Sequence, residues 1–80
     1  MTYDQTQIEE AVLALLAVFS FDGDRAWKGF SFDVMDCLHA QGFIENPASK
    51  SKSVLLTPQG LERGRKMAEH LFSASPGNPG

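Results

Sequence analysis

Apolar residues recur at helical spacing in the first quarter of the chain, and they predict a helix from about Gln5 to Ser20. From Ala11 to Phe19 no polar residue interrupts this helix on any side. A helix that is apolar all round is normally buried all round, and a chain of 80 residues has little material to surround one. The sequence therefore predicts that a second copy covers the spare face. The alternative is a central helix enclosed by the other elements of its own chain.

A second apolar stripe predicts a shorter helix, with Ser31 as its N-cap and Gly42 as the glycine that ends it. Val34, Met35 and Leu38 fall on one side of this helix when residues are placed about 100° apart. We expect this side to face the core.

Two short apolar runs follow, and they predict strands over residues 43–45 and 53–56 with a polar loop over residues 46–52. Residues 25–29, ahead of the second helix, are predicted to form a short helical turn. The expected fold is mostly α with a small two-stranded β-hairpin. Its order is helix, short helical turn, helix, strand, wing loop, strand, helix, which is a winged-helix-like layout.

The last helix has clear start signals, because Thr57 is a favoured N-cap and Pro58 suits the first helical position. Gly64 lies on the apolar face of this helix, where it predicts the close approach of another helix. Residues 73–80 are small, or are Pro and Gly, and are expected to form a disordered tail. The chain is therefore expected to hold a single domain over residues 1–72.

Two stretches of the chain resemble the recognition-helix and wing region of bacterial repressors of the multiple-antibiotic-resistance and phenolic-acid-decarboxylase classes. These stretches are Leu38-His39-Ala40-Gln41-Gly42-Phe43-Ile44 and Val54-Leu55-Leu56-Thr57-Pro58-Gln59-Gly60. With Trp27-Lys28-Gly29-Phe30 ahead of the second helix, the whole chain resembles a family of small bacterial proteins known only as a domain of unknown function. The resemblance implies a winged-helix-like fold and no assigned activity.

Charge and composition weigh against a nucleic-acid binder. Seven Lys and Arg stand against ten Asp and Glu, for a net charge of −3, whereas DNA-binding proteins usually carry a basic excess that neutralises phosphates. The single Cys37 excludes an internal disulfide. No basic region precedes the first apolar run, and that run is too short to span a membrane. A cytoplasmic protein with no membrane partner is expected.

A winged-helix protein that reads DNA needs hydrogen-bond donors on the exposed face of the helix before the wing. Here that face carries Asp33 and Asp36, whose carboxylates would repel phosphates. The candidate phosphate contacts lie outside this helix and are Arg25, Lys28, Lys50 and Lys52. The alternative is that the loop lysines only keep the loop soluble.

Catalytic chemistry is not indicated by any motif. Cys37 and His39 are two residues apart on a predicted helix, so their side chains point away from each other. His39 and His70 lack the spacing of a metal site. There is no phosphate-binding loop and no nucleophile elbow. We therefore expect no enzyme, no catalytic residue, no metal and no cofactor.

Three aromatic residues, Trp27, Phe30 and Phe32, lie in or beside the segment before the second helix. We expect them to plug one end of the core, with Trp27 partly exposed. The alternative is a recognition surface, since exposed aromatic side chains often anchor protein contacts.

Together these patterns predict a non-enzymatic module for protein interaction and self-association, in the form of a homodimer. The candidate dimer contacts are Leu13, Leu16, Ala17 and Phe72. The candidate surface for a protein partner consists of Trp27, Asp33 and Asp36. The alternative function is a small DNA-binding transcriptional regulator that contacts phosphates through the wing.

Overall fold

The computed structural model describes residues 2–48 and 50–73. The elements run in the order α1 (Gln5–Val18), β1 (Arg25–Trp27), α2 (Phe32–Ala40), β2 (Ser53–Leu55) and α3 (Pro58–Phe72). The described part of the chain is therefore mostly α with one two-stranded antiparallel sheet, as the sequence predicts. The body is flat, with extents of 44 × 37 × 19 Å. The predicted tail falls on residues 73–80, of which all but Ser73 lie outside the described residues.

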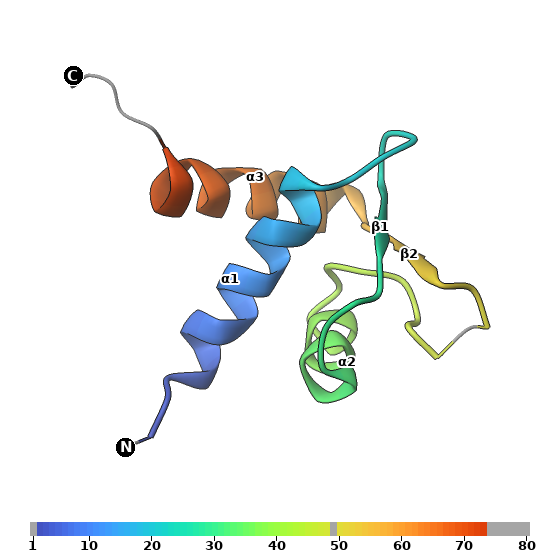
Figure 1. The fold of residues 1–80 in the computed structure, drawn as a ribbon, viewed down its shortest axis with the longest axis horizontal. Coiled ribbons are helices and arrows are strands. Elements are labelled where there is room, and N and C mark those ends of the chain that lie inside the picture. Colours follow the sequence, from blue (N-terminus) through green and yellow to red (C-terminus); the bar gives the residue numbers. More distant parts are fainter. Residues whose placement is uncertain (1, 49, 74–80) are drawn as a thin grey trace.

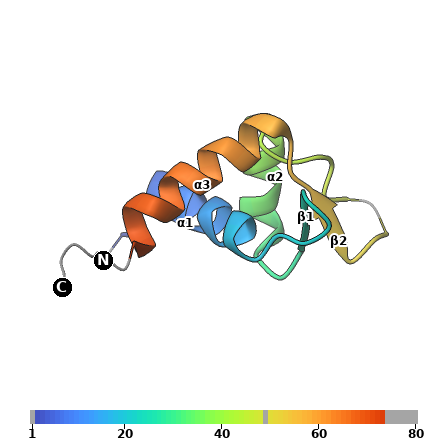
Figure 2. The same ribbon diagram turned by 90° about the horizontal axis from the view of Figure 1, so that it is seen from above.

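Helix α1 is the central element, because it contacts α3, α2 and β1. Figures 1 and 2 show α3 crossing the C-terminal end of α1, and in Figure 1 α2 and the sheet lie to the right of α1. The crossing is close because Gly64 of α3 has no side chain: a Cβ placed there would lie 2.8 Å from the Cβ of Ala17. The prediction that Gly64 permits a close helix approach is confirmed.

The core draws buried apolar side chains from α1, β1, α2 and β2, and the partly buried Leu61 of α3 packs against it. Val34, Met35 and Leu38 of α2 face inward as predicted, and Ile44 joins them from the segment after α2. The buried cluster consists of Val12, Leu13, Leu16, Ala26, Val34, Met35, Leu38, Ile44, Val54 and Leu56.

The sheet differs from the predicted hairpin. Strand β1 pairs with β2, so Ala26 lies opposite Val54, and residues 25–27 form a strand where the sequence predicts a helical turn. The predicted strand over residues 43–45 makes only an isolated bridge, between Ile44 and Leu56. Pairing with a distant strand outweighs local preference here, and the paired strand places Ala26 in the core, where β1 contacts α1.

The helix ends follow the local signals closely. The side chain of Asp4 accepts a hydrogen bond from the Gln7 backbone amide at 3.1 Å, and Thr57 caps α3 in the same way. Gly42 has φ +83°, and the amides of Gly42 and Phe43 close the end of α2 on the carbonyls of His39 and Leu38. Helix α1 ends at Val18, two residues before the predicted end.

The N-cap of α2 departs from the expected pattern. Ser31 occupies the N-cap position, but its side chain makes no capping hydrogen bond. The start of α2 therefore depends on packing of its inward face rather than on its cap.

Candidate functional surfaces

Several large aromatic side chains are exposed at the end of α1 and from β1 to the start of α2. Phe19 is 69% exposed, Trp27 62%, Phe32 59% and Phe30 39%. Trp27 is exposed as predicted, but Phe30 and Phe32 do not plug the core. The buried core is made by other side chains, among them Leu16, Ala26 and Met35, and these aromatic rings lie outside it.

An apolar groove lies between the end of α1, β1 and the segment after β1, with a volume of about 220 Å³. We call it the aromatic groove, and its lining residues are Leu15, Leu16, Phe19, Ala26, Trp27, Gly29 and Phe30. The ring of Trp27 also packs against Phe21, with ring centroids 4.8 Å apart. Six of the seven lining residues carry apolar side chains and the seventh is glycine, so the groove is suited to apolar contacts.

Three of the predicted dimer contacts are buried within the subunit. Leu13 is 1% exposed, Leu16 2% and Ala17 7%, because α3 and the other core elements cover them. They cannot contact a second copy while the subunit is folded. The predicted interface therefore cannot include these three residues. Phe72, at the end of α3, is 47% exposed.

The part of α1 that its own chain leaves uncovered lies elsewhere on the helix. Val18 and Phe19 are exposed and Leu15 is half-buried, and these residues share one side of the helix end at i, i+3 and i+4 spacing. The spare apolar face expected from the sequence therefore exists, but it consists of these side chains. Leu15 and Phe19 both line the aromatic groove.

Basic residues that are distant in sequence meet at one edge of the sheet. The backbone amide of Lys28 donates to the carbonyl of Lys52 at 2.9 Å, and Lys50 lies two residues before Lys52. The Arg25 guanidinium donates to the Ser53 hydroxyl at 3.2 Å. The Lys28 ammonium is engaged as well, because Nζ donates to the carbonyl of Pro47 at 2.8 Å.

An acidic residue adjoins this basic edge. Glu45 and Arg25 line the same shallow hollow, of about 260 Å³, beside β2. The negative charge of Glu45 lowers the attraction of this edge for a phosphate.

The exposed carboxylates of α2, Asp33 and Asp36, are joined by Glu9 from α1. All three raise the pKa of the Cys37 thiol, although burial of the thiol is the largest cause and the Glu9 carboxylate comes next, both by its charge and by a hydrogen bond. The thiol is therefore protonated at neutral pH and is a poor nucleophile. The sequence alone does not place Glu9 at this surface, since only the packing of α1 against α2 brings it there.

His39 is turned away from this thiol. Its Nδ1 donates to the carbonyl of Ile44 at 3.0 Å, whereas the Cys37 thiol interacts with Glu9. The two residues therefore do not form a thiol–imidazole pair, in agreement with the helix geometry expected from the sequence.

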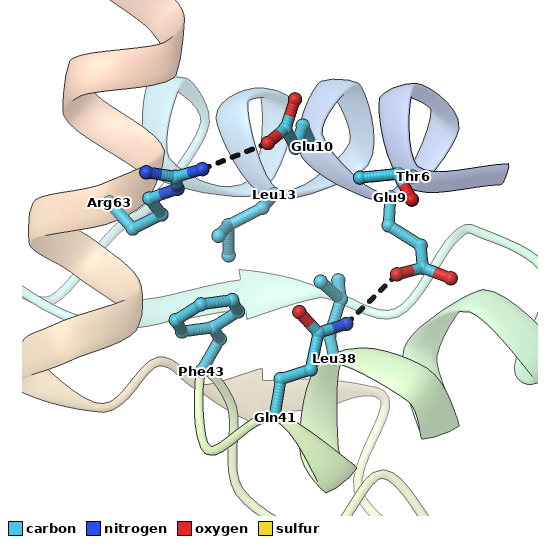
Figure 3. Close-up of a pocket in the computed structure, with 8 residues that line it drawn as sticks. All are labelled: Thr6, Glu9, Glu10, Leu13, Leu38, Gln41, Phe43 and Arg63. Carbon is cyan, nitrogen blue, oxygen red and sulfur yellow. Dashed lines mark hydrogen bonds and ion pairs between the residues drawn. The ribbon is translucent and has the colours of Figure 1, made fainter. Parts of the chain in front are cut away.

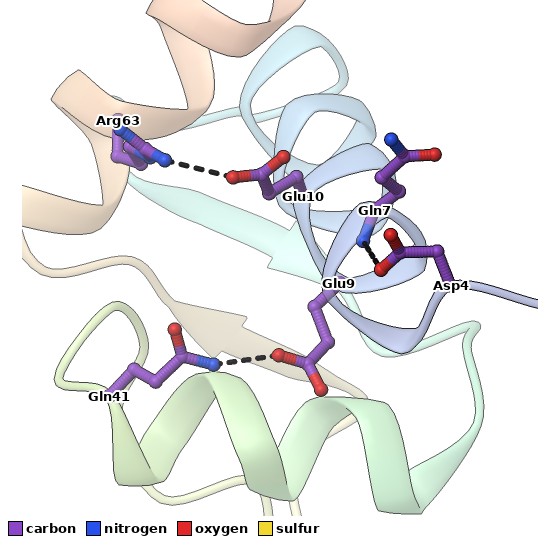
Figure 4. Close-up of polar contacts among 6 residues, drawn as sticks. All are labelled: Asp4, Gln7, Glu9, Glu10, Gln41 and Arg63. Carbon is purple, nitrogen blue, oxygen red and sulfur yellow. Dashed lines mark hydrogen bonds and ion pairs between the residues drawn. The ribbon is translucent and has the colours of Figure 1, made fainter.

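A wider cleft of about 420 Å³ lies where α1, α2 and α3 meet (Figure 3). Leu13, Leu38 and Phe43 point into it, and polar residues form its rim. Figure 4 shows that the rim carboxylates are occupied: Glu10 accepts from Arg63 at 2.9 Å, and Glu9 accepts from the Gln41 amide at 2.9 Å. These contacts tie the three helices together.

The described residues contain no group of three His, Cys, Asp or Glu side chains placed to hold a metal ion. In the same residues, every helix is too short or too polar to cross a membrane.

Comparison with known proteins finds two matches. The family model described as "Domain of unknown function (DUF6429)" matches residues 4–74. The uncharacterized protein y4hR of Sinorhizobium fredii (strain NBRC 101917 / NGR234) is 42% identical over 73 residues, which cover 91% of this chain and 99% of that protein. No solved structure matches. Neither match is to a repressor, so the resemblance of the wing region to repressors remains an expectation.

Proposed function

The chain belongs to the DUF6429 family of bacterial domains of unknown function, and we propose that it is a non-enzymatic module that associates with itself and with other proteins. The observation that supports this proposal is the amount of apolar surface outside the core. Eight large hydrophobic side chains are exposed among the described residues, and four of them are Phe19, Trp27, Phe30 and Phe32. Contiguous exposed apolar patches usually mark interaction sites.

The candidate chemistry of the molecule favours binding over catalysis. The Cys37 thiol has a raised pKa, the His39 ring is committed to a backbone carbonyl, and Glu9 and Glu10 are held by neighbouring donors. A general base or nucleophile needs a free partner within hydrogen-bond reach of a substrate. None of these groups offers such an arrangement.

Sedimentation equilibrium of the full chain in reducing buffer tests self-association. We expect the apparent mass to rise with concentration from 8.8 kDa toward twice that value. A mass that stays at 8.8 kDa at every concentration would remove self-association from the proposal. The reducing agent is needed because an intermolecular Cys37 disulfide would imitate a dimer.

A second candidate function, DNA binding, is favoured by the meeting of Lys28 with Lys52 at the edge of the sheet. In the winged-helix arrangement, α2 would enter the major groove and this edge would contact phosphates. Asp33 and Asp36 on the exposed face of α2 oppose this arrangement.

Fluorescence anisotropy with a labelled DNA duplex at several salt concentrations tests DNA binding. A phosphate-binding edge predicts affinity that falls steeply with added salt and a smaller salt slope for Lys50→Gln/Lys52→Gln. Asp33→Asn/Asp36→Asn is the companion variant, because removing these carboxylates from the face that would enter the major groove should strengthen binding. Absence of binding at low salt would exclude the DNA-binding function.

A further inference from the structure

We infer that the aromatic groove is the contact surface for a second copy of this chain, with Phe19 of each copy entering the groove of the other. The inference rests on the proposed self-association and assigns it to particular residues. The sequence predicts the contact at Leu13, Leu16, Ala17 and Phe72, and the first three of these are buried within the subunit. The groove lies at the end of the same helix.

The apolar character of the groove distinguishes it from the other hollows on the molecule. The hollow between α1 and the end of α3 is lined in part by Gln7, Glu10 and His70. Covering those polar groups without new hydrogen bonds would cost free energy. The aromatic groove is lined by aliphatic and aromatic side chains and one glycine, so covering it removes mainly apolar surface from water.

The size of the groove fits a side chain better than a metabolite. Its volume is about 220 Å³, whereas pockets for small molecules usually hold roughly 300–1,000 Å³ and carry a few polar groups that orient the ligand. The floor is formed by Leu16 and Ala26, which are fully buried, and the walls are the rings of Trp27 and Phe30. An inserted aromatic ring would meet apolar atoms on the floor and on both walls.

The groove and a residue that can fill such a groove lie on the same surface. Phe19 follows the last residue of α1 and is 69% exposed, so it forms a wall of its own groove without filling it. A twofold axis through this surface would let each copy present Phe19 to the groove of the other. Contacts of this self-complementary kind are the commonest among homo-oligomers.

The exposed aromatic area of the groove is large enough to form the apolar centre of a dimer interface, although not the whole interface. Aromatic side chains bury about 150–250 Å² each when fully covered, so the exposed parts of Phe19, Trp27 and Phe30 amount to roughly 350 Å² per subunit. A standard interface buries about 800 Å² per partner. Val18, exposed beside Phe19 on α1, adds to the apolar centre.

The test compares Phe19→Lys with Phe72→Lys in sedimentation velocity. The two variants are matched because both residues are exposed phenylalanines at the C-terminal ends of helices, where a lysine is compatible with the helix dipole. We expect Phe19→Lys to raise the dimer dissociation constant about thirtyfold or more, as for a central aromatic contact. Phe72→Lys is expected to leave it unchanged.

A second variant, Gly29→Leu, tests the same groove if Phe19→Lys does not fold. A Cβ at Gly29 meets nothing within 4 Å, so Gly29→Leu is expected to fill the groove without disturbing the core and to prevent dimerisation.

Three outcomes separate the inference from the proposed function. A wild-type dimer that both groove variants dissociate supports the inference. A wild-type dimer that survives these variants and is lost in Phe72→Lys overturns the inference and keeps self-association. A wild-type chain that is monomeric at every concentration overturns both.

Discussion

A Cβ on Gly64 would lie 2.8 Å from the Cβ of Ala17 and 2.8 Å from the carbonyl oxygen of Leu13. This separation is shorter than ordinary van der Waals contact, so α3 rests directly on the backbone of α1 at this point. The contact explains why Leu13 and Ala17 are buried within one subunit. It also leaves the exposed end of α1, at Val18 and Phe19, as the uncovered part of the helix.

The helix crossing predicts that Gly64→Ala destabilises the fold. Alanine is the better helix former by about 1 kcal/mol, but the added methyl group must push α3 away from α1, and overpacking of a core costs about 1–3 kcal/mol. We expect a net loss of stability in urea denaturation. Gly29→Ala is the control, because its Cβ has open space. Equal or greater stability of Gly64→Ala would show that the helices are not in direct contact.

Thr57 is predicted to hold the end of α2 to the start of α3 through its hydroxyl group. Its Oγ1 accepts from the Gly60 amide at 3.0 Å and donates to the carbonyl of Gly42 at 2.7 Å. Thr57→Ala removes both hydrogen bonds and is expected to cost about 1–2 kcal/mol of unfolding free energy. Thr57→Ser keeps the hydroxyl and should recover most of that loss. Equal losses in the two variants would assign the effect to the methyl group instead.

Cys37 is predicted to react slowly with iodoacetamide, with a pH midpoint above that of an ordinary thiol. Burial and the Glu9 carboxylate both raise the pKa of this thiol in the folded protein. Glu9→Gln removes the charge and keeps the burial, so it should lower the midpoint only in part. A midpoint that does not move in Glu9→Gln would mean that the carboxylate lies too far from the sulfur to matter.

The same shift predicts a loss of stability in alkaline solution. The unfolded chain releases the thiol proton at the ordinary pKa, and the folded chain only at the raised one. Above the ordinary pKa the unfolded state therefore binds fewer protons, and the unfolding free energy falls as pH rises. Cys37→Ser should show a flatter profile over this range. Parallel profiles for the two proteins would contradict the assignment.

Leu13→Glu is predicted to unfold the subunit rather than to yield a folded monomer. Leu13 is 1% exposed in the core, and an unpaired carboxylate there would cost several kcal/mol. We expect circular dichroism to show loss of helix for Leu13→Glu. Phe19→Lys, on the exposed end of α1, should keep its helix content. A folded monomer from Leu13→Glu would support the interface first expected from the sequence.

The parts of the fold that local contacts determine are predictable from the sequence. Asp4 caps α1, Thr57 caps α3 and Gly42 ends α2, each through hydrogen bonds that reach only a few residues along the chain. Strand β1 is different, because Arg25 contacts Ser53 across 28 positions. Three residues, Arg25–Trp27, are too few to show a period of two, and their distant partner decides their conformation.

The candidate site shows the same division between local and distant effects. The all-round apolar character of α1 correctly indicates that one subunit leaves part of this helix uncovered. Which part of α1 is uncovered depends on where α3 crosses it. The sequence alone does not reveal that Leu15 and Phe19 remain outside the buried core. The groove also needs β1 to bring Trp27 beside the end of α1, and the sequence predicts a helical turn there.

The emission wavelength of Trp27 as a function of protein concentration tests the central claim most directly, since this is the single tryptophan of the chain and it lines the aromatic groove. We predict a shift to shorter wavelength as the chain associates, because the partner covers the indole ring, and no shift in Phe19→Lys. Emission that stays at the wavelength of a solvated indole while the mass doubles would place the contact on another face of the molecule.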